Sequence, residues 1–135
     1  MIPNCDITIY NKYLVSRAEV FQRSVIRDVG WQATKAIMGT KAGALASNVA
    51  TIFIPSVSHT EYRAPKAWQA LVTKTANWTL QEGDVVVKGE VADTITSGFT
   101  ITDLRAKYDD VVTITSVDVM DFGSSNVQHW EVGCK

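Results

Sequence analysis

Residues 103–135 constrain the possible fold more than any other part of the chain. Within them, residues 111–119 (VVTITSVDV) are rich in β-branched side chains, which favours a β-strand. A shorter strand is predicted at residues 130–132, only a few positions before Lys135. A terminus of this kind is expected to be held within a sheet.

Further short strands are predicted at residues 6–10, 49–54 and 85–91. Residues 20–29 fit the periodicity of both a helix and a strand. We favour a strand, because β-branched and aromatic residues are frequent there and no helix cap precedes them. A turn is expected at Asn11 and Lys12, directly after the first strand.

Two short helices are also predicted. The first begins at Pro65, which suits the first turn of a helix. The second covers residues 102–108, with Thr102 as its N-cap and Asp103 near its positive end. Many short strands separated by turns predict a mainly β protein, either a small β-barrel or a sandwich, with one or two short helices.

The length of 135 residues predicts a single β-rich domain, residues 1–135. Residues 33–48 differ from the rest because alanine, glycine and serine predominate. We expect a long loop or hairpin tip there, flexible around residues 38–48.

The net charge of −1 argues against a protein that grips nucleic acid tightly, because such proteins carry a basic excess. No stretch resembles a signal peptide or a membrane span, so synthesis in the cytoplasm and no membrane contact are expected. Cys5 and Cys134 are expected to be reduced, although a bridge between them stays open.

Polar residues with catalytic or metal-binding potential are scattered. His59 and His129 stand alone, so no metal, cofactor or catalytic residue is predicted, and His59 is expected in a solvated loop. Asp118 and Asp121 fall on opposite faces of a regular strand, which argues against paired carboxylates. The alternative of a small hydrolase requires Asp118, Asp121 or His129 to converge.

The chain contains four tryptophans, and we expect most of them to pack in the core. The alternative is an exposed aromatic surface for sugars, which would indicate a capsid decoration or carbohydrate-binding β-sandwich module. The four residues are Trp31, Trp68, Trp78 and Trp130.

Several segments together resemble a family of short structural proteins encoded by tailed phages and prophages of Gram-positive bacteria. The resemblance depends on their order and spacing, and it spans nearly the whole chain. The segments are residues 6–12 (DITIYNK), 83–90 (GDVVVKGE), 108–114 (YDDVVTI), 121–124 (DFGS) and 129–133 (HWEVG).

This resemblance implies a non-enzymatic virion protein of the phage neck, a head-completion or stopper subunit between the portal or adaptor and the tail. Such proteins are small β-barrels that form rings around the DNA channel. The expected partners are other copies in a hexamer or dodecamer, the portal or adaptor and tail proteins, and DNA as passive cargo. The expected location is the head–tail junction of the virion, and the host cytoplasm during assembly. A tail-terminator ring protein is an alternative.

Two groups of residues are candidates for roles in such a ring. The small, weakly charged loop suits contacts with a partner, and its candidates are Gly39, Thr40, Lys41, Gly43 and Leu45. An acidic channel wall lets DNA pass without adhering. Its candidates are Asp109, Asp110, Asp118 and Asp121.

Overall fold

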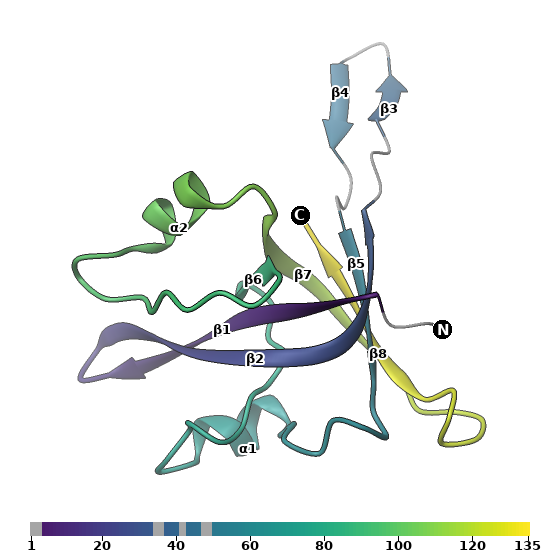
Figure 1. Cartoon of the computed structure of the whole chain (residues 1–135), viewed down its shortest axis with the longest axis horizontal. Helices are drawn as coiled ribbons and strands as arrows, with labels where there is room; N and C mark the ends of the chain where they lie inside the picture. Colours follow the sequence, from purple (N-terminus) through teal and green to yellow (C-terminus); the bar gives the residue numbers. More distant parts are fainter. Residues whose placement is uncertain (1–3, 34–36, 41–42, 47–49) are drawn as a thin grey trace.

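The computed structural model describes residues 4–33, 37–40, 43–46 and 50–135. Six antiparallel strands close into a barrel in the order β1-β2-β5-β8-β7-β6 (Figure 1). The predicted mainly β class is confirmed, and the architecture is a barrel with two short helices outside it. The barrel strands are β1 Cys5–Val15, β2 Ala18–Ala33, β5 Ala50–Pro55, β6 Val85–Lys88, β7 Val111–Met120 and β8 His129–Cys134.

β1 and β2 form a long hairpin that extends beyond the rest of the barrel (Figure 1). The turn expected at Asn11 and Lys12 is wrong, because β1 continues to Val15 and the chain reverses at Ser16 and Arg17. Asn11 is fully buried, and its side-chain amide donates to the Thr79 carbonyl over 2.7 Å. This distant partner satisfies a residue that would otherwise favour a turn.

A β-bulge interrupts the β1–β2 ladder near the start of β1. Cys5 pairs with Val29 whereas Ile7 pairs with Ile26, so β2 contains one extra residue there. Asp28 has a φ of 58°, and its backbone N–H donates to Asp6 Oδ1 over 3.0 Å. The bulge therefore turns the backbone of β2 beside Asp28.

Between β2 and β5, the strands β3 (Ile37–Thr40) and β4 (Gly43–Ala46) form an antiparallel hairpin that stands away from the barrel (Figure 1). We call these eight residues the arm. Four of the residues predicted to contact a partner, Gly39, Thr40, Gly43 and Leu45, lie in the arm. Lys41 lies outside the described residues.

The first helix, α1 (Pro65–Gln69), begins at Pro65 as predicted. The second, α2 (Ile101–Lys107), is capped by Thr100, so the prediction of Thr102 as N-cap is wrong. Thr100 Oγ1 accepts from the Asp103 N–H over 3.4 Å, and the Asp103 carboxylate accepts from the Thr100 N–H over 2.9 Å. This reciprocal capping box satisfies two N–H groups that the helix leaves unpaired.

Alternate residues of β6 divide the apolar interior into two clusters. Val86 lies in the main cluster within the barrel, whereas Val85 and Val87 join Tyr10 and Leu104 in a second cluster under α2. β6 ends at Lys88, so it is shorter than the strand predicted at residues 85–91. In the described part of the chain, no helix is both long and apolar enough to cross a membrane.

Candidate functional site

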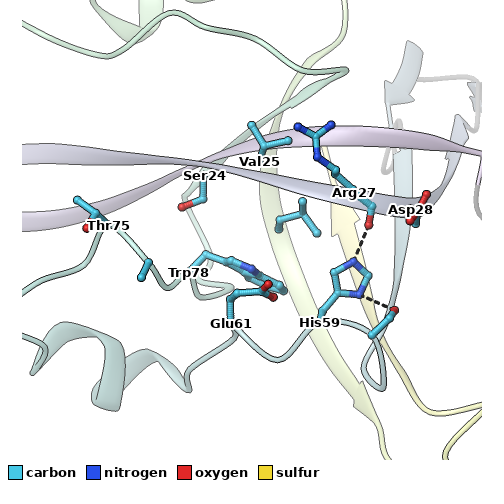
Figure 2. Close-up of a pocket in the computed structure, with 11 residues that line it drawn as sticks. Ser24, Val25, Arg27, Asp28, His59, Glu61, Thr75 and Trp78 are labelled. Atoms are coloured by element: carbon cyan, nitrogen blue, oxygen red, sulfur yellow. Dashed lines mark hydrogen bonds between the residues drawn. The ribbon is translucent and has the colours of Figure 1, made fainter.

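A pocket lies between β2 and the segments around residues 58–61 and 75–78 (Figure 2). Its volume is about 320 Å³. The side chains at its wall are mostly polar, and they include Ser24, Asp28, Glu61 and Thr75. His59 and Trp78 reach into the same space from the two connecting segments (Figure 2).

His59 is only 8% exposed, so the prediction that it lies in a solvated loop is wrong. Its Nδ1 lies 2.5 Å from the Pro55 carbonyl oxygen, and its Nε2 lies 2.5 Å from the Arg27 carbonyl oxygen (Figure 2). The Arg27 carbonyl is accessible because Arg27, beside the bulge, is paired neither with β1 nor with β5. The imidazole therefore connects β2 to the end of β5.

Both ring nitrogens of His59 lie within hydrogen-bond distance of a carbonyl oxygen, and the tautomer decides which nitrogen donates. Ser58 Oγ lies 3.2 Å from Nδ1, so a hydroxyl is also available at that nitrogen. Neither nitrogen is directed at open space in which a substrate could lie. This geometry supports a positional role for His59 and does not resemble a general base aimed at a substrate.

An aromatic cluster forms the inner wall behind His59. The ring centroids of Trp78 and His59 are 6.3 Å apart, and Trp78 also contacts Trp130 at 5.9 Å. Tyr62 packs against Trp130 at 4.4 Å. The predicted packing of tryptophans in the core is confirmed, since each is at most 8% exposed, and none is available to stack on a sugar at the surface. They are Trp31, Trp68, Trp78 and Trp130.

A buried polar network, which the sequence did not indicate, joins Asn11 in β1 to residues 79–84. The Asp84 carboxylate is 1% exposed, and it accepts from Asn11 Nδ2 and from Gln81 Nε2, each over 2.8 Å. The Lys12 backbone N–H donates to it over 3.1 Å. Burial raises the pKa of Asp84 above its usual value, although these three donors oppose the shift.

The predicted channel residues divide into two exposed pairs. Asp109 and Asp110 lie between α2 and the start of β7, whereas Asp118 and Asp121 lie at the far end of β7. Asp110 and Asp118 are eight residues apart along β7, which corresponds to about 26 Å at a rise of about 3.3 Å per residue. The four carboxylates therefore follow one strand and do not converge on one site.

A group of exposed apolar side chains was also missed. It lies where β5 ends and where β7 continues into β8, and we call it the end surface. Each of its members is more than half exposed, namely Val57, Val119, Phe122 and Val127. An available signal was the presence of phenylalanine and valine in the loop DFGSSNV, where turn residues usually predominate.

The cysteines and the acidic residues give no metal site within the described ranges, where no group of three or more His, Cys, Asp or Glu residues is suitably placed. Cys5 and Cys134 are both free thiols. Burial raises the pKa of Cys134 to about 12, and burial is also the main reason why the pKa of Cys5 is raised.

Comparison with known proteins gives a family and no further identification. No curated protein and no solved structure matches the chain. The match to a family covers residues 2–135, which is nearly the whole chain. The chain therefore belongs to DUF6751, a family of unknown function.

Proposed function

We propose that this chain is a non-enzymatic structural protein of a phage neck, a head-completion or stopper ring subunit between the portal or adaptor and the tail. The proposal begins from the ordered segments that resemble virion proteins of tailed phages. The single structural observation that carries it is the arm, which extends from a closed barrel and pairs with no barrel strand in the part of the chain that is described.

The arm has the properties of a segment that binds a neighbour. A closed barrel satisfies the backbone of its own strands, so it has no open edge with which to pair. An isolated two-stranded hairpin is at best marginally stable in water. A neighbouring subunit or an adjoining virion protein would supply the contacts that the barrel does not give. The proposed contact includes Gly39, Thr40, Lys41, Gly43 and Leu45.

The charge distribution fits passage of DNA through a ring. The two acidic pairs lie at opposite ends of β7, so a β7 that faced the channel would present negative charge at both of its ends. Carboxylates repel phosphates and release no counterions to them, so DNA would slide past without adhering. Asp109, Asp110, Asp118 and Asp121 remain the proposed channel-facing residues.

The direct test is to purify tailed particles from the strain that encodes this chain and to quantify their proteins by mass spectrometry. We expect the chain in complete particles, at the stoichiometry of one hexameric or dodecameric ring. Particles with joined heads and tails that lack the chain would contradict the proposal. A monomer in isolation would not contradict it, because such rings can form only on their partner.

A shortened variant tests the arm within the same particles. Ala33 and Ala50 are register partners in the β2–β5 pair, as Val15 and Ala18 are across the Ser16–Arg17 turn. Replacement of residues 34–49 by Asn-Gly, a pair suited to a two-residue hairpin, is therefore expected to preserve the barrel. We expect this variant to fold but to be excluded from particles, and normal incorporation would rule out the proposed role of the arm.

A further inference from the structure

The tip of the β1–β2 hairpin exposes two apolar side chains. Leu14 is 67% exposed and Val15 is 48% exposed. The turn that follows places Ser16 and Arg17 at φ values of 50° and 69°, a conformation that favours glycine or asparagine. The tip therefore combines exposed apolar surface with a turn that its residues do not favour intrinsically, and such features are typical of a contact surface.

The end surface lies at the opposite end of the long axis of the molecule, beside the β7–β8 connection (Figure 1). Its members come from segments that are in contact. The Ser56 N–H donates to the Gln128 carbonyl over 3.2 Å, which places Val57 and Val127 on neighbouring segments. A Cβ on Gly123 would lie 2.9 Å from Val127 Cγ2, so the loop that carries Phe122 folds closely over Val127.

The charges at the two ends are complementary. Residues 116–131 contain Asp118, Asp121 and Glu131 but no lysine or arginine. At the tip, Lys12 and Glu19 lie 3.9 Å apart and offset one another, which leaves Arg17 as the charge at the turn. Each end therefore offers apolar side chains together with a charge opposite to that of the other end.

We propose that the hairpin tip of one copy covers the end surface of a second copy, head to tail. Leu14 and Val15 would pack on Val119, Phe122 and their neighbours, and Arg17 would pair with whichever of Asp118 and Asp121 does not face the channel. The occupant is another copy because one chain carries both complementary surfaces at opposite ends. A heterologous contact of this kind generates a ring if the rotation closes.

This inference rests on the proposed function only for the closure of the ring. The contact between two copies is independent of what the ring does, and purified protein is sufficient to test it. Incorporation of the chain into particles tests the proposed function. The cross-link described below, between position 15 of one copy and position 119 of another, tests the contact. The two hypotheses can therefore fail separately.

The experiment is a cross-link between two differently tagged chains, both carrying Cys5→Ser so that the native, partly exposed thiol does not react. One chain carries Val15→Cys and the other carries Val119→Cys, and a short bismaleimide is added at rising protein concentration. We expect the mixed product to exceed both like-with-like products several-fold. Val72→Cys, at a fully exposed valine that belongs to neither surface, is the control.

The result overturns the proposal if the mixed product does not exceed the Val72→Cys control at any concentration tested, up to the solubility limit. A dominant tip-to-tip or end-to-end product would also overturn it, because either would indicate a symmetric contact. Both cysteines replace exposed valines, so little loss of stability is expected, and thermal unfolding checks this for each chain.

A charge exchange provides the second measurement, by sedimentation velocity on chains without added cysteines. Arg17→Asp alone, and Asp118→Lys with Asp121→Lys, should each weaken self-association about tenfold, which corresponds to about 1.4 kcal/mol. Combining all three substitutions should restore the association. Failure of the combined variant to recover any association would show that these charges do not meet.

Discussion

The side-chain amide of Asn11, in the middle of β1, donates both to the Asp84 carboxylate over 2.8 Å and to the Thr79 carbonyl over 2.7 Å. Its own Oδ1 accepts from the Thr79 N–H over 3.1 Å. One buried asparagine thus joins β1 to the segment that leads into β6. Because the carboxylate is almost fully buried, removal of either partner leaves a polar group without a partner in the interior.

Replacement of Asp84 by asparagine should alter how stability depends on pH. The raised pKa means that the folded state binds the proton more tightly than the unfolded state. The stability from this group is therefore fully present below the unfolded pKa, and it is lost as pH rises through the folded value. The difference in unfolding free energy, wild type minus Asp84→Asn, should fall from about pH 3 toward neutrality.

Urea unfolding at several pH values measures that difference. Glu82→Gln, at an exposed neighbour, is the control for loss of one negative charge. A difference that rose with pH would mean that Asp84 is stabilised as a carboxylate, and it would contradict the dominance of burial.

His59→Ala should destabilise the barrel by about 1–3 kcal/mol, because the hydrogen-bonded bridge from the imidazole to the Arg27 and Pro55 carbonyls is lost. The half-buried His129 bonds one carbonyl, from Nδ1 to Val127 at 2.9 Å, and its other contacts, with Glu131 at 3.9 Å and with the Phe53 ring, are weaker, so His129→Ala should cost less. Chemical denaturation of both variants gives the comparison. Equal losses would show that the bridge from β2 to the end of β5 contributes little.

Thr100→Ala should destabilise the protein by about 0.5–2 kcal/mol, because the capping box of α2 is lost. Thr102→Ala is the matched control, since Thr102 lies one residue into the helix and is exposed. Thermal unfolding distinguishes the two. A larger effect at Thr102 would contradict the assigned cap.

Cys134 should resist a maleimide reagent at pH 7.5 in the folded protein, because burial both blocks access and raises the thiol pKa to about 12. Cys5 is partly exposed and should react slowly, and both thiols should react at once in denaturant. Mass spectrometry after timed labelling follows each site. Rapid labelling of Cys134 would indicate that β8 opens readily from the barrel.

Strand composition was sufficient to predict much of the fold. The β-branched residues of 111–119 and the mixed apolar pattern of 20–29 identified β7 and β2, because these side chains suit a pleated surface. The order of strands in the barrel was not predictable, since it depends on pairings between distant segments. The pairing of β5 with β8 is one example.

The errors occurred where a distant contact outweighs a local preference. Asn11 favours a turn in isolation, but the buried network with Thr79 and Asp84 holds it in a strand. Thr100 and Thr102 are equally suitable caps by type, and only the backbone geometry distinguishes them. His59 is buried because a bulge many residues earlier supplies its acceptor.

The position of β8 also affects the order of events during synthesis. This strand pairs with β5 on one side and with β7 on the other, and it is translated after both of them. Until it leaves the ribosome, both neighbours keep unpaired edges that can associate with other nascent chains. A chain cut short before His129 should therefore aggregate, even though the other five strands of the barrel are present.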